Sequence, residues 1–233
     1  MRINQYIAAA GICSRRSADE LIKKGRVKVN GSVLDVLGYH VQENDVVEVD
    51  GARVEPETKK VYYLLNKPMG YVTSTADKEG KPIVTELVPD SVRVFPIGRL
   101  DLNTTGLLIL TNDGELSNKL MHPSGEFDKK YLVRAAGIVT RKEAERLEKG
   151  VDIGGFITSP AEVYLIKHDR NSTLAEIIIH EGKNRQVRRM FEAIGHPVQE
   201  LCRTGLGQLS IGKLALGQCR KLSPAEVEYL KRV

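Results

Sequence analysis

The stretch that decides the fold is Gly98-Arg99-Leu100-Asp101-Leu102-Asn103-Thr104-Thr105-Gly106, followed by Leu107-Leu108-Ile109-Leu110-Thr111. Its second half is a short apolar run, which predicts a buried strand. Its first half is a polar loop that carries one acid, Asp101, between two glycines. Glycine permits backbone conformations that other residues avoid, so such a loop can approach a ligand closely. The stretch therefore predicts a carboxylate presented at the start of a core strand.

The residues around Asp101 allow two interpretations of this acid. Arg99 stands two positions before it, and a nearby cation would keep a sheltered carboxylate ionised. A loop acid can also simply cap a turn with Asn103 and the threonines. The complete string is more specific than a turn, and it resembles the catalytic motif of pseudouridine synthases, in the branch called the RsuA/RluB type. The resemblance implies that Asp101 is a catalytic carboxylate.

Composition and charge narrow the classes of protein. A chain of 233 residues and 25.9 kDa suits one medium domain plus a small one. A hydrophobic content of 41%, a charged content of 28% and a mean hydropathy of −0.25 indicate a soluble protein with a real core. The net charge of +5 favours a polyanionic partner. The apolar stretch at the amino terminus is too short for a signal peptide or a membrane span, so we expect a cytoplasmic protein without a membrane partner.

The sequence gives no support for a metal or a nucleotide cofactor. Its three cysteines are scattered, and no cysteine and histidine group has the spacing of metal ligands. No Gly-x-x-x-x-Gly-Lys-Ser/Thr loop is present, which argues against an RNA-dependent nucleotide hydrolase. We therefore expect no metal and no cofactor.

Charge is unevenly distributed near the amino terminus. Residues 1–30 hold seven Lys or Arg against two acids, whereas residues 31–60 hold three against seven. The basic part reads as two helices, one ending at Gly11 and one from Arg15 to Lys24 with Ser14 as its N-cap. The turn pair Asn30-Gly31 then predicts a tight hairpin, and residues 45–49 predict another strand.

This amino-terminal pattern resembles the S-four-type RNA-binding domain. The matching strings are Ser14 to Ala18, Leu21-Ile22 and Gly25 to Gly31. An ordinary solvated helix face is the plain alternative for the cations. The resemblance implies that residues 1–60, including a polar linker from residue 55, grip folded RNA through its phosphates and shape. The cations predicted to bind RNA here are Arg15, Arg16, Lys23, Lys24, Arg26 and Lys28.

Residues 61–233 read as a second domain. A strand from residue 61 breaks at Lys67-Pro68 and Gly70, which match the first motif of the synthase family and which also fit a plain strand-ending turn. Residues 129–134, 163–166 and 174–179 predict further strands, and Thr140 to Glu143 is a capping-box start for a helix that ends at Gly150. Strands outnumber helices, so we predict an α+β protein: a small RNA-binding domain, then a catalytic domain with a mixed, largely antiparallel sheet.

A third informative string runs from Glu181 to Met190. We predict that Asn184 caps a helix there, with Arg185, Arg188 and Arg189 sharing one face. A solvated basic face is an even alternative on these residues alone. The resemblance implies that Arg188 pairs with Asp101, and that the segment from Lys129 supplies an active-site tyrosine, Tyr131. In the catalytic domain, the cations predicted to bind RNA are Arg99, Lys183, Arg185 and Arg189.

The implied chemistry suits these residue types. Uridine becomes pseudouridine when the bond from sugar to ring nitrogen breaks, the uracil turns, and the sugar joins a ring carbon instead. One carboxylate can act as nucleophile or base, a guanidinium can hold it, and an aromatic ring can stack on the detached uracil. The target nucleotide must leave its stack to reach such a pocket.

The motifs resemble the RluB-like type more than RsuA itself, which implies large-subunit ribosomal RNA as the substrate. We also expect a monomeric enzyme. Two alternatives stay open, namely the same reaction on small-subunit ribosomal RNA and a non-catalytic RNA-binding factor in ribosome assembly. A non-catalytic factor would have no use for Asp101 together with Arg188.

Overall fold

The structure is a computed structural model that describes residues 1–77, 79–89, 91–121 and 127–232. The chain forms two compact units. The first is Met1–Val61 with the segment Asp90–Arg93, and the second is Tyr62–Pro89 with Val94–Val233. The linker residues 55–60 adopt no regular structure.

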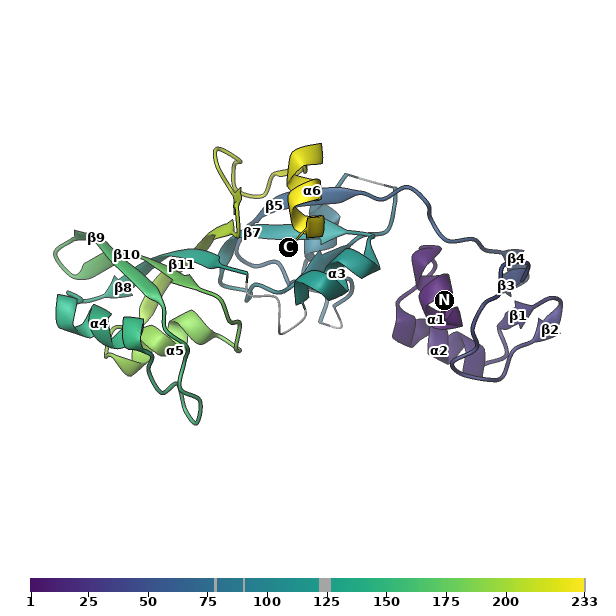
Figure 1. The fold of residues 1–233 in the computed structure, drawn as a ribbon, viewed down its shortest axis with the longest axis horizontal. Helices are drawn as coiled ribbons and strands as arrows, with labels where there is room; N and C mark the ends of the chain where they lie inside the picture. Colours follow the sequence, from purple (N-terminus) through teal and green to yellow (C-terminus); the bar gives the residue numbers. More distant parts are fainter. Residues whose placement is uncertain (78, 90, 122–126, 233) are drawn as a thin grey trace. The chain divides into compact units, whose positions relative to one another are not determined.

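The first unit places two helices beside a small antiparallel sheet (Figure 1). The order of the sheet is β2-β1-β3-β4. The core is formed by apolar residues such as Ile3, Ile7 and Ile22, all nearly fully buried. The elements are α1 (Ile3–Ala9), α2 (Arg15–Lys23), β1 (Val27–Val29), β2 (Ser32–Val33), β3 (Val47–Val49) and β4 (Ala52–Arg53).

Local sequence signals account for this unit. Ser14 caps α2 as predicted, because its hydroxyl oxygen accepts a hydrogen bond from the backbone of Ser17 at 3.1 Å. Asn30 and Gly31 both have positive φ, +53° and +82°, as a two-residue turn between β1 and β2 requires. The predicted helices and hairpin are confirmed, although β2 is shorter than the sequence suggests.

The second unit is built on a nine-stranded sheet whose main path is β13-β5-β7-β11-β8-β10-β9. Strand β6 pairs with β7, and β12 pairs with β11. All pairings are antiparallel except that of β7 with β11, so the predicted α+β class with a mixed, largely antiparallel sheet is confirmed. The strands are β5 (Tyr62–Lys67), β6 (Phe95–Ile97), β7 (Thr105–Thr111), β8 (Lys129–Ala136), β9 (Glu162–His168), β10 (Ser172–Ile179), β11 (Val198–Leu206), β12 (Leu209–Ser210) and β13 (Cys219–Lys221).

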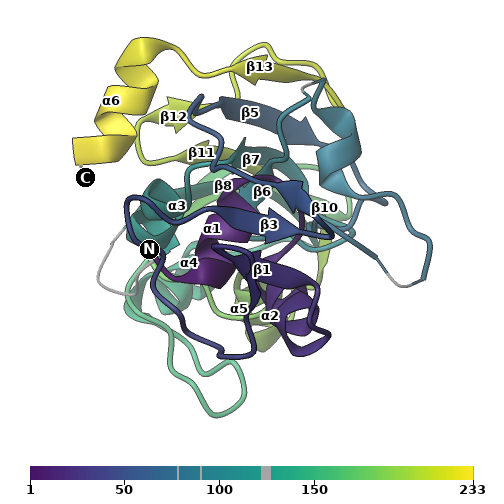
Figure 2. The same cartoon turned by 90° about the vertical axis from the view of Figure 1, so that its right-hand side faces the viewer.

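Helices cover this sheet in separate groups. Figure 1 shows α4 and α5 on the same side of β8 to β11, and Figure 2 shows β13, β5 and β7 following one another. Leu107 and Ile109 of β7 pack in one core with Leu116 of α3 and Leu230 of α6. The helical elements are the 3₁₀ turn η1 (Val84–Leu87), α3 (Gly114–Met121), α4 (Arg141–Lys149), α5 (Gln186–Ala193) and α6 (Pro224–Arg232).

The two predicted caps of the second unit have different outcomes. Thr140 and Glu143 form the expected capping box at the start of α4. The prediction that Asn184 caps α5 is wrong, because the N-cap position is Arg185 in a left-handed conformation with φ +50°. The side chain of Gln186 reaches back instead, and its Oε1 accepts a hydrogen bond from the backbone of Lys183 at 2.8 Å.

Gly106 marks the point where the two halves of the sheet meet. It pairs with Arg203 in the parallel β7–β11 ladder, and its φ is +111°. A Cβ at this position would lie 2.3 Å from the carbonyl oxygen of Arg203. Only glycine therefore allows β7 to pass this close to β11, five residues after Asp101.

Candidate active site

Asp101 lies in the loop that leads into β7. Its neighbour Leu100 is buried, and Thr73 fixes that residue by donating to its carbonyl oxygen at 2.7 Å. The backbone turns directly after the acid, because the amide of Thr104 donates to the carbonyl oxygen of Asp101 at 3.0 Å. The side chain of Asp101 is 31% exposed, so its carboxylate is sheltered but still open to a ligand.

The Asp101 loop is held from beneath by a buried cation. Lys67, at the end of β5, has no exposed surface. Its ammonium donates to the carbonyl oxygens of Pro68, Asp101 and Thr104 at 3.0, 3.1 and 2.9 Å, and more weakly to that of Leu102 at 3.5 Å. Burial lowers the pKa of Lys67 to about 8, and the negative charge of Asp101 opposes that shift.

Arg188 also holds the loop, but differently from the prediction. The open alternative of a solvated basic face does not hold for Arg188, and the implied ion pair with Asp101 does not occur among the described residues. Its side chain is buried, and its guanidinium donates to the carbonyl oxygens of Asn103 at 2.7 Å and Val198 at 3.2 Å. Burial lowers the pKa of Arg188, the charge of Arg185 lowers it further, and Asp101 opposes both. The Nε of Arg188 is buried without a hydrogen-bond partner among the described residues.

The cation that pairs with the acid is Arg185. Its Nη1 lies 3.8 Å from Oδ2 of Asp101, and its side chain is 47% exposed. Arg185 is the N-cap residue in a left-handed conformation, and α5 begins at the next residue, Gln186, so Arg185 stands outside the helix. The family resemblance implies that Arg188 pairs with Asp101. In the structure two arginines contact Asp101 and its loop: Arg188 donates to the loop backbone, and Arg185 faces the carboxylate.

A polar network fixes the start of α5 relative to its surroundings. Gln186 is buried, and its side-chain amide donates to Glu181 at 2.5 Å. The same carboxylate oxygen of Glu181, Oε1, also accepts a hydrogen bond from the backbone amide of Ser159 at 2.9 Å. Because Gln186 and Arg185 are adjacent, this network also sets the position of the cation beside Asp101.

Tyr131 lies in β8, where it is 9% exposed. It pairs with Arg203 of β11, which pairs in turn with Gly106 of β7. One row across the sheet therefore connects Tyr131 to the strand that follows the Asp101 loop. Arg203 is buried and ties this row together, because its Nε donates to the carbonyl oxygen of Leu107 at 2.8 Å.

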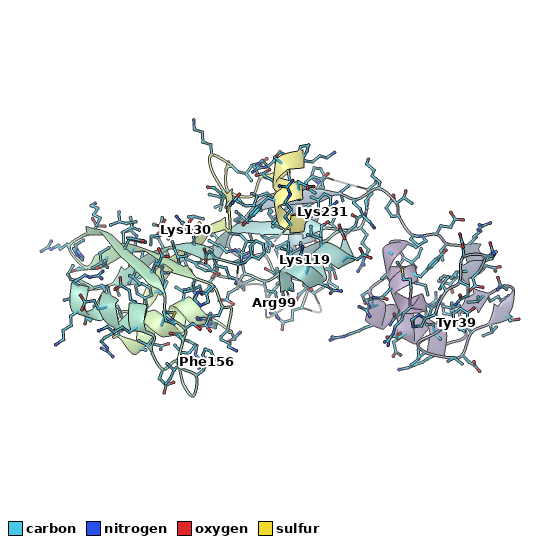
Figure 3. All side chains as sticks on the ribbon, in the orientation of Figure 1. Tyr39, Arg99, Lys119, Lys130, Phe156 and Lys231 are labelled. Atoms are coloured by element: carbon cyan, nitrogen blue, oxygen red, sulfur yellow. The ribbon has the colours of Figure 1, made fainter. Side chains whose placement is uncertain are left out.

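The residues predicted to bind RNA are mostly on the surface. In the first unit Arg15, Arg16, Lys24 and Lys28 are exposed. Lys23 and Arg26 are exposed too, but Lys23 pairs with Glu20, and Arg26 pairs with Asp50 through two hydrogen bonds of 2.6 and 2.5 Å. In the second unit Arg99 (labelled in Figure 3), Lys183 and Arg185 are exposed, and Arg189 is half-buried.

Sequence reasoning missed the role of two residues near the acid. The Lys67-Pro68 motif was noted, yet nothing local indicated that Lys67 reaches carbonyl oxygens 34 to 37 residues away. No sequence pattern indicated that Thr73 contacts the backbone of Leu100. The described residues contain no group of three or more His, Cys, Asp or Glu that could hold a metal ion, and none of the helices in that part of the chain is long and apolar enough to cross a membrane.

Comparison with known proteins decides the family. The family model for RNA pseudouridylate synthase matches residues 61–193, and the S4 domain model matches residues 1–47. The chain belongs to the RNA pseudouridylate synthase family. The S4 match agrees with the resemblance that the strings from Ser14 to Gly31 carry.

Individual relatives of this synthase cover almost its whole length. Ribosomal large subunit pseudouridine synthase B of Bacillus subtilis (strain 168) is 46% identical, over 99% of this chain and 95% of its own. The dual-specificity RNA pseudouridine synthase RluF of Escherichia coli (strain K12) is 39% identical, over 97% and 77%. A solved structure titled as a pseudouridylate synthase superposes with a TM-score of 0.71 at 28% identity and covers 99% of both chains.

Proposed function

We propose that this synthase converts a specific uridine of large-subunit ribosomal RNA into pseudouridine, with Asp101 as the catalytic carboxylate. The observation that carries this proposal is the sheltered acid faced by Arg185 at 3.8 Å, on a loop whose backbone is fixed by two buried cations. The name of the Bacillus subtilis relative supports large-subunit RNA as the substrate.

The proposed roles follow from the positions of the residues. Asp101 reacts with the flipped nucleotide while the bond from sugar to ring nitrogen breaks and the bond to a ring carbon forms. Tyr131 offers a ring against which the detached uracil stacks. Arg185 keeps the acid charged and oriented, and Arg188 preserves the shape of the loop, with its unpaired Nε as a further donor for the acid or the base.

The first unit, residues 1–60 with the linker, is proposed to grip structured RNA through Arg15, Arg16, Lys24 and Lys28, which are exposed and form no ion pair among the described residues. We also propose that the enzyme acts as a monomer in the cytoplasm. Sedimentation with and without RNA would test the monomer.

The test is Asp101→Asn, a change that keeps shape but removes charge and nucleophilic or basic capacity. Turnover should fall by about 10³-fold or more, while RNA affinity stays close to that of the wild type. Release of tritium from ring carbon 5 of labelled uridine in large-subunit transcripts measures turnover, and small-subunit transcripts serve as the matched substrate. Retained turnover would remove Asp101 from the mechanism, and turnover on the small-subunit transcript alone would reassign the substrate.

A further inference from the structure

The hairpin of residues 150–158 projects from the end of α4 beside α5. Gly150 allows its entry, because a Cβ there would lie 2.3 Å from the carbonyl oxygen of Thr158. The amides of Gly154 and Gly155 donate to the carboxylate of Asp152 at 2.8 and 2.9 Å, which fixes the tip. Val151 and Thr158 are buried at the base, where the Thr158 amide donates to the carbonyl oxygen of Val151 and the Val151 amide donates to the Thr158 hydroxyl, both at 3.0 Å. The hairpin is thus a defined structure rather than a loose loop.

Apolar side chains sit on this hairpin where solvent reaches them. Phe156 is half-buried, and Ile157 is 73% exposed. Figure 3 shows Phe156 on the loop that extends below α5. Nζ of Lys183 lies 4.4 Å from the centroid of the Phe156 ring, a cation–π contact.

The surroundings of the ring are basic and connect to the acid. Lys183 stands two residues before Arg185, which faces Asp101 at 3.8 Å. Arg189, one helical turn after Arg185, packs on Gly154, where a Cβ would lie 2.8 Å from its Nη2. The base of the hairpin is tied to the same frame, because Ser159 donates to Glu181, the partner of Gln186. Ring, cations and carboxylate are therefore held together by the start of α5.

We propose that Phe156 is a stacking platform for an unpaired base of the RNA strand next to the target uridine, with Lys183, Arg185 and Arg189 binding the adjoining phosphates. The inference deepens the proposed function, since it rests on an RNA substrate entering at Asp101. Single-stranded nucleic acid is bound by this combination of basic groups that follow the backbone and an aromatic face that accepts any base. Lys183 covers Phe156 in the free protein and is placed to meet a phosphate when a base arrives.

The fluorescence experiment uses the absence of tryptophan from the chain. Phe156→Trp introduces a single tryptophan at the platform, which is excited selectively over the tyrosines, and Ile157→Trp introduces one at the next position of the same hairpin as a matched control. Each full-length variant is titrated with poly(U) and with an RNA duplex of equal length at low ionic strength. Poly(U) should quench F156W strongly and I157W weakly, and the duplex should quench F156W less. Unchanged emission of F156W across the poly(U) titration overturns the proposal.

A second pair of variants separates stacking from packing. Phe156→Leu keeps apolar bulk without a π-face, so its affinity for poly(U) and its kcat/KM on ribosomal RNA should each fall about tenfold. Ile157→Ala should match the wild type in both, and the thermal unfolding of F156L should match that of the wild type. Wild-type affinity and turnover in F156L overturn the platform. If the wild type itself turns over no ribosomal RNA while F156W is still quenched by poly(U), the proposed substrate fails and the platform stands.

Discussion

Cations serve opposite purposes in the two units of this synthase. In the first unit Arg15 and Arg16 of α2, and Lys24 at its C-cap, are exposed to solvent. In the second unit Lys67 and Arg188 are buried, and both donate to backbone carbonyl oxygens of the Asp101 loop. The exposed set can bind phosphates without affecting the fold, whereas the buried set gives the loop its shape. The same residue types therefore predict salt-dependent binding in one unit and stability coupled to catalysis in the other.

Among the substitutions that test this difference between the two units, Arg188→Ala is expected to change stability and turnover the most. It leaves the carbonyl oxygens of Asn103 and Val198 without their donor, and it should lower the free energy of unfolding by about 3 kcal/mol and turnover by about 10²-fold or more. Arg188→Lys should recover only part of both losses, because an ammonium lacks the planar fork. Urea unfolding and tritium release measure the two losses.

The matched control is Arg185→Ala. Arg185 is 47% exposed, so stability should stay near the wild-type value while turnover falls by about tenfold. An R188A protein with wild-type stability, or an R185A protein that unfolds as easily as R188A, would erase the division of roles between the two arginines.

Lys67→Met should come next in size. Four carbonyl oxygens lose a shared donor, but a buried charge is also removed, so a net loss of about 2 kcal/mol in the free energy of unfolding is expected. Turnover should fall by about tenfold or more as the loop loosens. Lys130→Met, at a lysine whose side chain is 45% exposed, is the control and should change neither quantity.

Lys67 also predicts a pH dependence. Its pKa of about 8 in the fold lies below the ordinary 10.5, so between these values the unfolded chain binds more protons than the folded one. The wild-type free energy of unfolding should therefore rise relative to that of Lys67→Met over this window. Single-turnover rates should decline above pH 8, because the uncharged amine holds the loop less well. A decline of equal midpoint in K67M would assign the titration to another group.

The smallest effects on stability are expected in the first unit. Replacing Arg15, Arg16, Lys24 and Lys28 by Ala should leave urea unfolding unchanged and reduce the slope of log affinity against log salt by up to about 3 to 4. Arg26→Ala should change RNA affinity far less, because Asp50 already holds that guanidinium. Asp50→Ala, which frees Arg26, should raise affinity slightly. An R26A effect as large as that of Lys28→Ala would show that the Asp50 pair opens on RNA.

Local signals predicted the first unit and several elements of the second. Ser14, the Asn30-Gly31 pair and the capping box at Thr140 each act within a few residues, so their outcome could be read from the chain. Strands β11 and β13 were missed, because their partners β7, β8 and β5 are distant in sequence and their own patterns are irregular. The excess of strands over helices predicted the largely antiparallel sheet, and the family resemblance implied the same.

The candidate site shows the same limit. The sequence predicted the acid and its motif, but it did not predict which arginine lies beside the acid and which binds the loop backbone. Periodicity treats Arg185 and Arg188 alike, yet Arg185 precedes α5 in a left-handed conformation, whereas Arg188 lies within α5 and donates to the carbonyl oxygen of Asn103, 85 residues earlier. Because the acceptor is so distant in sequence, the sequence of the helix alone does not predict which arginine is buried.

The bare Cα of Gly106 has a consequence for how the protein reaches its native state. The parallel ladder that it permits pairs Thr105 with Cys202, and the Thr105 hydroxyl donates to the carbonyl oxygen of Leu201, 96 residues away. The antiparallel pairs β5–β7 and β8–β10 close shorter loops. Closing longer loops costs more chain entropy, and contacts of high sequence separation slow folding. The two halves of the sheet can therefore form early and join late. Because the Asp101 loop stands at that junction, we predict that a nascent or partly folded chain lacks the proposed site.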